Sequence, residues 1–297
     1  MTYDAIIVGG SFAGLAAATQ LARARRNILV VDAGLRRNRF AEYSHGFLGQ
    51  DGRAPGDIIA DARAQLLAYP TVEIVDDTAT AALATAGGFA VSMAKTGEIA
   101  AGRLVLATGV NDMLPAVPGL AERWGRSVFH CPYCHGYEIG KGRIGVLAIG
   151  PLSVHQAMLI ADWGPTTLLT NGTFEPDVEQ ARALAARSID IETQRVTLIS
   201  GFADVRLADG RLLHFNGLFT ASRTSMASPL AEQLGCAFVE GPLGPFIETS
   251  GFMQTSVPGV FACGDAARGA GSVSIAVGDG AMAGVGAHQS MVFTPAA

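Results

Sequence analysis

Short runs of β-branched apolar residues alternate with stretches rich in Ala and Leu. Residues 5–8 (AIIV) form the first run, which stops at GGSFAG, residues 9–14, and residues 15–26 are then rich in Ala and Leu. The first pattern predicts a buried strand and the second a helix. A second apolar run, residues 28–31, ends in Asp32. The pattern therefore predicts a βαβ unit with a glycine turn after its first strand and an acidic residue after its second.

A similar alternation returns in the middle of the chain. Residues 104–106 predict another buried strand, and the Pro- and Gly-containing stretch 110–119 is typical of a connection. Residues 143–149 then predict a strand, 150–161 a helix and 166–169 a strand. A second βαβ unit is therefore expected after the connection.

The C-terminal part is expected to return to the first unit. Residues 200–213 contain an Asp-Gly turn and predict a β-hairpin, and GPLGP at 241–245 is interpreted as a hinge. Residues 260–263 predict a strand and residues 272–289 a helix.

Together these elements predict an α/β chain with two Rossmann-like, three-layer nucleotide-binding domains, the second inserted in the first. The first domain is expected to comprise residues 1–114 and 243–297, and the inserted domain residues 115–242.

Composition is consistent with two globular domains. The chain has 297 residues, 49% of them hydrophobic and 16% charged, which is enough apolar material for two packed cores. The formal net charge of −5 gives no basic footprint, so a nucleic-acid partner is not expected. The printed N-terminus shows no leader, and no apolar run reaches the roughly 18 residues of a membrane span, so we expect a cytoplasmic protein without a membrane partner.

The glycine turn suits a dinucleotide. Such a turn needs glycine where the strand bends and where the helix packs on the strand, and a small residue where backbone amides approach the pyrophosphate. Gly9 and Gly14 occupy the outer positions, and Ser11 stands where the middle glycine is usual. Asp32 suits a hydrogen bond to a ribose diol.

A Cys-x-x-Cys motif lies in HCPYCHGYE, residues 130–138. Cys131, Cys134 and the following His135 match a c-type haem attachment site, half of a zinc site or a redox-active disulfide. The cytoplasmic expectation disfavours haem attachment, and no second Cys/His pair with zinc-finger spacing exists, so no metal is expected. The redox disulfide is the favoured interpretation.

These motifs together resemble the low-molecular-weight thioredoxin reductase family. The resemblance rests on GGSFAG with VVDAG, ATG at 107–109, the CxxC, TSVPGVFACGD at 255–265 and GDGAMA at 278–283, and it spans nearly the whole chain. It implies FAD as the cofactor, with the inserted domain binding NAD(P)H and carrying the CxxC at its edge. A homodimer is also expected from the family pattern.

The resemblance further implies residue roles. The implied FAD-binding residues are Gly9, Gly10, Ser11, Phe12, Ala13, Gly14, Asp32, Ala33, Asn38, Arg39, Ala107, Thr108, Gly109, Gly264, Asp265, Ser272 and Val273. Cys134 would face the flavin and Cys131 would exchange with substrate. An imidazole with an ordinary pKa of about 6.5 accepts a proton at cytoplasmic pH, which makes His135 the expected acceptor and His130 a second candidate.

The inserted domain departs from the reductase pattern. Its turn, Ala148 to Ser153, keeps only the middle glycine, and Pro151 removes a backbone N–H from a phosphate cradle. After the strand 166–169, Glu175 and Asp177 stand where arginines for the NADPH 2′-phosphate are expected. Binding of NAD(P)H is therefore doubtful, although a tolerant site for NADH or NADPH stays open.

The CPYCHGYE motif with an eroded NADPH site resembles the dithiol oxidases that close disulfides in holomycin, gliotoxin and romidepsin. We therefore expect an FAD-dependent thiol:disulfide oxidoreductase that forms a disulfide in a small-molecule dithiol, with O2 or NADP as acceptor. An alternative is a disulfide reductase for a thioredoxin-type protein, fed by NAD(P)H or ferredoxin. A non-catalytic flavin- or zinc-binding module is the alternative from another class.

Overall fold

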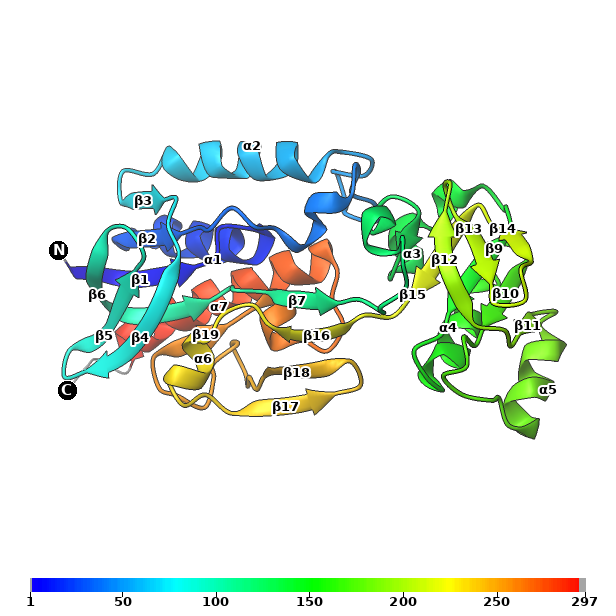
Figure 1. Cartoon of the computed structure of the whole chain (residues 1–297). Helices are drawn as coiled ribbons and strands as arrows, with labels where there is room; N and C mark the ends of the chain where they lie inside the picture. The colour runs from blue at the N-terminus through cyan, green and yellow to red at the C-terminus, as the bar shows by residue number, and fades with distance from the viewer. Residues whose placement is uncertain (1, 294–297) are drawn as a thin grey trace.

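The first part of the molecule is built on a seven-stranded sheet. A computed structural model describes residues 2–293 of the chain. The sheet has the order β3-β2-β1-β6-β5-β4, with β19 paired to β6 (Figure 1). Its strands are β1 (Thr2–Val8), β2 (Ile28–Val31), β3 (Val72–Val75), β4 (Ala79–Thr85), β5 (Gly88–Met93), β6 (Gly97–Leu106) and β19 (Val260–Ala262).

Strands β3, β2, β1, β6 and β19 run parallel, whereas β4 and β5 are antiparallel to their neighbours. The Ala-rich sequence of α1 (Phe12–Arg23) lets this helix pack against α7 (Val273–Phe293), and α2 (Pro55–Leu67) contacts α1. The helices and the sheet share one hydrophobic core.

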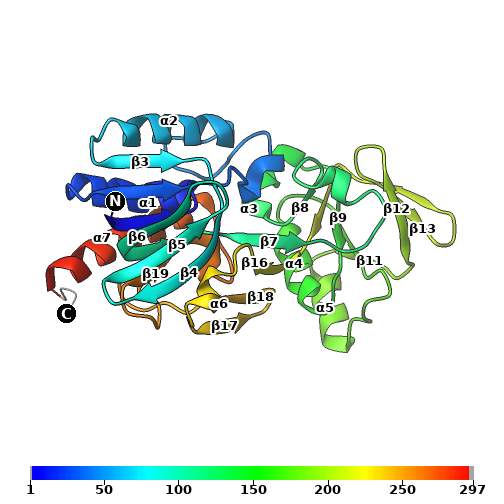
Figure 2. The same cartoon turned by 60° about the vertical axis from the view of Figure 1, so that its left-hand side comes forward.

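The second part carries a separate parallel sheet of order β11-β10-β9-β15-β8 (Figure 2). Its strands are β8 (Val128–Phe129), β9 (Ile144–Leu147), β10 (Thr166–Leu169), β11 (Asp190–Glu192) and β15 (Gly217–Thr220). An antiparallel sheet packs beside it, formed by β12 (Val196–Ser200), β13 (Asp204–Leu207) and β14 (Leu212–His214). The helices are α3 (Pro132–His135), α4 (Leu152–Ile160) and α5 (Val178–Ala186), and the 3-10 turns are η2 (Ala121–Arg123) and η3 (Tyr137–Ile139). Two core clusters lie within this part.

Two antiparallel strands, β7 (Val110–Met113) and β16 (Arg223–Met226), carry the chain out of the first part and back into it (Figure 1). The chain returns to the first part before residue 243, the boundary expected from the sequence. Helix α6 (Leu230–Gln233) follows the crossing, and its Leu230 and Ala231 belong to the core of the first sheet, as does Ile247.

The interpretation of residues 241–245 as a hinge is therefore wrong. These residues comprise the end of β17 (Phe238–Gly241), the turn at 242–243 and the start of β18 (Gly244–Ile247), an antiparallel pair beside the first part. The Gly and Pro residues that suggested a hinge are explained equally well by a tight hairpin turn.

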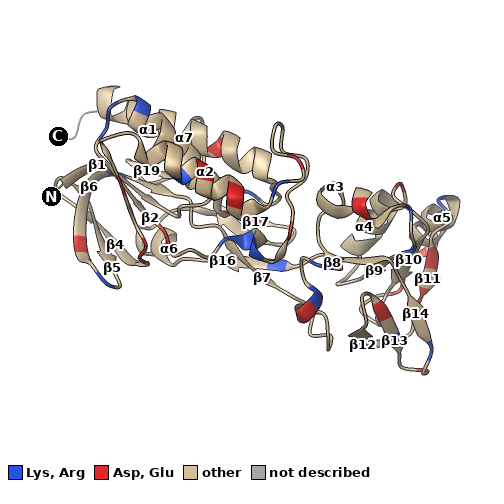
Figure 3. Cartoon of the chain, turned by 90° about the horizontal axis from the view of Figure 1, so that it is seen from above, with Lys and Arg blue, Asp and Glu red and all other residues tan. Residues whose placement is uncertain are grey.

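The prediction of two Rossmann-like α/β domains, the second inserted in the first, is confirmed in its class and order. Lys and Arg are scattered among Asp and Glu over both parts (Figure 3). None of the helices within residues 2–293 combines the length and apolar character that a membrane crossing requires.

The contact between α1 and α7 provides a test of the fold. A Cβ on Gly280 would lie 2.0 Å from the carbonyl oxygen of Ala13, which is backbone and cannot move aside. We expect Gly280→Ala to lower the free energy of unfolding by about 1 to 3 kcal/mol. Denaturant unfolding of the purified protein measures this difference.

Gly278 on the same helix supplies the matched control. A Cβ there meets no atom within 4 Å, so Gly278→Ala should be neutral or stabilise by up to about 1 kcal/mol through helix propensity. Equal effects of the two substitutions would contradict the close approach of α1 and α7.

Candidate active site

Four parallel strands end at one edge of the first sheet. Val8 at the end of β1 lies opposite Val31 of β2 and Leu106 of β6, and Leu106 lies opposite Ala262 of β19. The residues that follow these strands therefore meet at one edge, as is usual for ligand sites in open α/β sheets. They are the turn 9–14, Asp32, Ala107 to Gly109, and η4 (Gly264–Ala267).

The glycines of the first turn are required by close contacts. A Cβ on Gly14 would lie 1.7 Å from the carbonyl oxygen of Gly9, and Gly9 itself has a φ of 109°. A Cβ on Gly10 would lie 2.7 Å from the carboxylate of Asp32. The turn thus brings α1 close to the strand ends and lets the Asp32 side chain lie against the backbone of Gly10.

The start of α1 fits a phosphate group. Ser11 occupies the N-cap position, and its side chain makes no capping hydrogen bond. The first N–H groups of a helix have no acceptor within the helix, so those of Phe12, Ala13 and Gly14 are suited to a pyrophosphate. The turn and the helix start therefore fit the diphosphate of FAD.

Asp32 has partners that the sequence did not reveal. Its Oδ2 accepts a hydrogen bond from Arg63 Nη1 at 2.9 Å, and its Oδ1 accepts one from the Gly34 amide at 3.0 Å. Arg63 also donates to Asp76 at 3.0 Å. Each carboxylate oxygen keeps a further lone pair for a ribose hydroxyl, so Arg63 would orient Asp32 rather than replace the sugar.

Two of the three arginines in the loop after β2 have different kinds of partner. Arg39 donates to the carbonyl oxygen of Arg36 at 2.8 Å and lies 4.4 Å from the centre of the Phe40 ring, so its bonds are local. Arg37 instead donates to Asp265 Oδ2 at 2.9 Å. Ala33 is exposed, and Asn38 lies in η1 (Arg37–Phe40).

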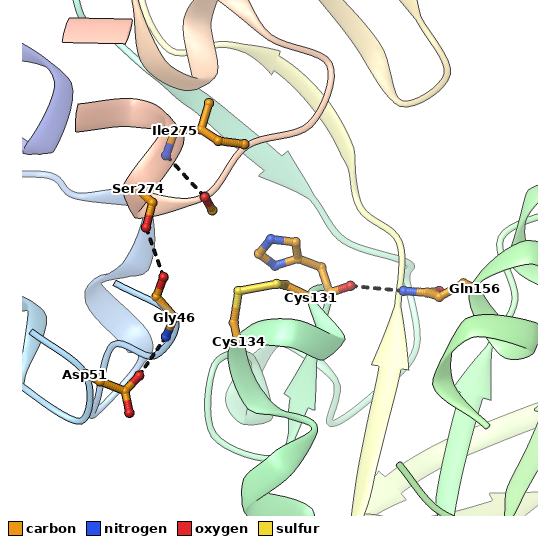
Figure 4. Close-up of a disulfide and its surroundings, with 9 residues drawn as sticks. Gly46, Asp51, Cys131, Cys134, Gln156, Ser274 and Ile275 are labelled. Carbon is orange, nitrogen blue, oxygen red and sulfur yellow. Dashed lines mark hydrogen bonds between the residues drawn. A yellow bond between two sulfur atoms is a disulfide. The ribbon is translucent and has the colours of Figure 1, made fainter. Parts of the chain in front are cut away.

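Helix α7 begins at the same site. The side chain of Ser272 accepts a hydrogen bond from the amide of Ile275 at 3.3 Å, and Ser274 Oγ donates to the carbonyl oxygen of Gly46 at 2.9 Å (Figure 4). The amide of Gly46 donates to Asp51 at 2.7 Å. The start of α7, including Val273, is thereby tied to the loop before α2.

Cys131 and Cys134 form a disulfide at the start of α3, with their Cα atoms 5.3 Å apart. Figure 4 shows the sulfur atoms on the side of α3 that faces Gly46 and Ser274 of the first part. The favoured interpretation of the CxxC as a disulfide agrees with the structure. Within residues 2–293, no three His, Cys, Asp or Glu side chains are grouped as metal ligands would be.

His135 differs from the expectation of an ordinary imidazole. Its ring stacks on Phe129 with the centroids 4.3 Å apart. Burial, with smaller contributions from His130 and His45, lowers the pKa of His135 to about 4. His135 is therefore neutral throughout the physiological range, free to accept a proton but a weaker base than a solvated histidine.

His130 contacts Trp124 and Gln156 of α4, both within the second part. Its ring stacks on Trp124 with the centroids 5.8 Å apart. Its carbonyl oxygen accepts a hydrogen bond from Gln156 Nε2 at 3.1 Å (Figure 4). Among the described residues 2–293, the Oε1 of Gln156 is buried without a hydrogen-bond partner. Gln156 thus fixes the backbone directly before Cys131.

A histidine from the first part faces the motif. His45 Nε2 lies 3.5 Å from Glu138 in η3, and His45 Nδ1 lies 3.6 Å from Asp51. Since η3 follows the CxxC directly, this contact connects the loop before α2 with the redox motif.

The turn before α4 is closed on itself. The hydroxyl of Ser153 accepts a hydrogen bond from the Ile149 amide at 3.0 Å, and Pro151 at the N-cap has no amide hydrogen. Two positions that a phosphate cradle would use are therefore lost. Asp177, which stands where an arginine for the 2′-phosphate is expected, caps α5 by accepting a hydrogen bond from the Gln180 amide at 2.8 Å.

Comparison with known proteins decides the family. The model of the pyridine nucleotide-disulphide oxidoreductases matches residues 3–280. The chain belongs to this family. Its cofactor is FAD, which the glycine turn and the start of α1 fit, and the chain is a flavin-dependent oxidoreductase enzyme.

Individual relatives cover almost the whole chain. Thioredoxin reductase tcpT from Claviceps purpurea is 36% identical over 95% of this chain and 92% of its own length. An oxidoreductase structure from Agrobacterium tumefaciens is 56% identical, covers 99% of this chain and 100% of its own, and has a TM-score of 0.97. The structure of HlmI is 32% identical, with a TM-score of 0.90 and coverage of 97% and 92%.

Sequence reasoning missed several residues of the site. It did not single out Arg63, His45, Glu138, Gln156 or Asp112. Their partners lie far away in the sequence, and no motif surrounds them. The local signal that the sequence did contain was the pair of arginines on either side of Asn38, Arg37 and Arg39, in the loop after β2.

The lowered pKa of His135 predicts how stability depends on pH. Between about pH 6.5 and pH 4 the unfolded chain binds a proton at this residue and the folded protein does not. His135 therefore reduces the free energy of unfolding by about 3 kcal/mol as the pH falls through this range. We expect His135→Gln to remove that loss, measured by urea unfolding at pH 7 and pH 4.5.

His155→Gln, which replaces an exposed histidine on α4, gives the baseline for this comparison. The same pH dependence in the wild type and in His135→Gln would show that burial does not hold the His135 imidazole neutral.

Proposed function

We propose that the protein is a dithiol oxidase, which closes a disulfide in a small-molecule dithiol with O2 as the final electron acceptor. The observation that carries this proposal is the Cys131–Cys134 disulfide, placed on the second part beside Gly46 and the start of α7 of the first (Figure 4). We assign FAD binding to the first part. We assign weak or no binding of NAD(P)H to the second part.

The chemistry begins at Cys131. A substrate thiolate attacks its Sγ, the Cys131–Cys134 bond breaks, and Cys134 leaves as a thiolate. The second substrate thiol, once deprotonated, attacks the substrate sulfur of the mixed disulfide and releases Cys131. The substrate loses two electrons and two protons, and the cysteine pair gains the electrons.

His135 and His130 are the proposed proton acceptors. His135 follows Cys134 directly, and burial keeps its imidazole neutral, so an acceptor site is available at neutral pH. His130 precedes Cys131, and its backbone is held by Gln156. FAD supplies the two-electron acceptor through which the cysteine pair returns to the disulfide and O2 is reduced to H2O2.

The closed turn before α4 favours an oxidase over a pyridine-nucleotide-dependent reductase. Ser153 occupies the Ile149 amide, and Pro151 supplies no donor. The CPYCHGYE motif supports the same direction of electron flow by its resemblance to natural-product dithiol oxidases.

A disulfide reductase is the second candidate. It is favoured by the relatives named thioredoxin reductase, including tcpT and aclD from Aspergillus oryzae. Its substrate would be a protein disulfide, and its reductant NAD(P)H or ferredoxin. A homodimer in the cytoplasm stays our prediction for either candidate.

Anaerobic mixing of the holoenzyme with dithiothreitol, NADPH or NADH tests the direction of electron flow. We expect dithiothreitol to bleach the flavin absorbance and either nicotinamide to react at least about 100-fold more slowly, because the phosphate contacts are missing. Admission of O2 should restore the absorbance and produce H2O2. Fast bleaching by NADPH with thioredoxin-coupled turnover would instead establish the reductase.

Cysteine variants test whether the disulfide carries the reaction. We expect Cys131→Ser and Cys134→Ser each to abolish dithiol turnover while FAD stays bound. Cys236→Ala is the control, because Cys236 is buried, burial raises the pKa of its thiol, and it lies outside the motif. Unchanged oxidation of dithiothreitol in Cys131→Ser would show that the disulfide does not carry the reaction.

A further inference from the structure

A charged cluster lies where the two parts of the molecule join. Arg37 donates to both carboxylate oxygens of Asp112, from Nε at 2.9 Å and from Nη2 at 2.6 Å. Its Nη1 donates to Asp265 Oδ2 at 2.9 Å. One planar guanidinium thus engages two carboxylates, a geometry that lysine cannot reproduce.

One carboxylate of the cluster belongs to the strands that cross between the parts (Figure 1). Asp112 lies on β7 and is opposite Thr224 of β16. The hydroxyl of Ser222, just before β16, donates to Asp112 Oδ1 at 2.6 Å. A shift of β7 against β16 would therefore disturb the bonds of Asp112 to both Arg37 and Ser222.

The other carboxylate belongs to the flavin side. Asp265 lies in η4, and a Cβ on the neighbouring Gly264 would lie 2.9 Å from the Cβ of Ala13 at the start of α1. A Cβ on Gly271 would lie 2.4 Å from Asp265 Oδ1, so the backbone of Gly271 borders the second carboxylate oxygen. Arg37 and Gly271 thus leave this carboxylate little freedom to turn, beside the turn that fits the diphosphate of FAD.

The cluster is largely withdrawn from water. The side chain of Asp112 is 10% exposed, and those of Arg37 and Asp265 are each 24% exposed. Charges in such a place are screened less than those of a surface pair, so the loss of one partner is felt by the others.

We propose that Arg37 is a positioning residue that couples FAD binding to the position of the second part. It does so by holding Asp265 at the flavin site and Asp112 on the crossing strand with the same guanidinium. This inference goes beyond the proposed function, because it depends on the flavin cofactor and not on the direction of electron flow.

The coupling acts in both directions. A carboxylate oxygen has two lone pairs, so Asp265 can keep its bond to Arg37 while a hydroxyl of FAD donates to it. That bond would fix the carboxylate, and with it the guanidinium and Asp112, so the crossing strands are held more firmly when FAD is bound. By thermodynamic linkage, firmly held strands favour FAD binding by the same factor. The disulfide is then held in place when a flavin is present to receive its electrons.

Hydrogen–deuterium exchange of the full-length protein, without FAD and at saturating FAD, tests this coupling. We expect FAD to slow exchange in residues 110–113 and 223–226 by at least about 5-fold, the lower end of typical coupling between two sites. Arg37→Gln and Asp112→Asn should each abolish this slowing, while exchange in the turn 9–14 still slows when FAD binds. A merely structural role of Arg37 would speed exchange in both states and leave the effect of FAD unchanged.

Titration of the apoprotein with FAD, followed by flavin fluorescence, gives a second readout. We expect Arg37→Gln to raise the Kd for FAD about 10-fold, because Asp265 loses the charged hydrogen bond that orients it. Asp112→Asn should raise the Kd about 5-fold by linkage, although Asp112 lies on the crossing strand.

Arg53→Gln is the matched control. Arg53 donates to Asp61 of α2 and to Gln50 of its own loop, each at 2.7 Å, so the substitution breaks an ion pair of the first part away from the crossing strands. It should change neither the Kd for FAD nor the effect of FAD on residues 110–113 and 223–226.

Arg37→Lys keeps the positive charge and covers the case in which Arg37→Gln folds poorly. A single ammonium cannot reproduce the fork that reaches Asp265 and both oxygens of Asp112, so the effect of FAD on the crossing strands should be lost here as well.

Persistence of that effect in the Arg37 variants would overturn the inference and assign the coupling to β18, which contacts both η4 and β16. Exchange of the wild-type crossing strands that does not respond to FAD would overturn it too. Neither measurement requires substrate turnover. The coupling can therefore stand in an enzyme that does not oxidise dithiols, and dithiol oxidation without the coupling would leave the proposed function standing alone.

Discussion

The proposed flavin site depends on how closely α1 can approach the ends of β1 and β6. Gly9 and Gly14 allow backbone contacts that a single methyl group would prevent, and Ala107 at the end of β6 borders the same space. This approach places the free amides at the start of α1 beside the edge where four parallel strands end. On the other side of α1, Gly280 lets α7 approach the backbone of Ala13 closely, next to the same turn.

The position of the second part relative to the first depends on the paired strands β7 and β16. Strands β7 and β16 are the route by which the second part is held relative to the first, and two further contacts flank them, Arg37 with Asp112 and His45 with Glu138. The disulfide lies beside the start of α7 because of these strands and contacts rather than because of α3 itself, which has only four residues. A small change in the crossing would move both cysteines together.

The sequence predicts what local chemistry determines. The turn 9–14, Asp32 and the CxxC are local motifs whose residue types and spacing follow from the phosphate or sulfur chemistry they serve, and the alternating pattern is enough for the fold class. Arg37 and Arg63 could not be assigned in this way, because their partners lie at sequence separations of 75 and 31 residues and no periodicity marks them. The hairpin that includes residues 241–245 could not be predicted for a different reason. Gly and Pro indicate a turn, but they do not indicate which hydrophobic core the turn packs against.

The hydrogen bond from the Ile149 amide to Ser153 has a consequence for how such an enzyme changes its electron source. Restoring a phosphate cradle would require the hydroxyl to be removed, Pro151 to be replaced and cations to be added after β10, and none of these steps alone provides a complete site. The intermediate sequences would gain little affinity for a nicotinamide nucleotide. If the protein is the oxidase proposed above, the closed turn leaves the inserted domain as the carrier of the disulfide rather than as a nucleotide site.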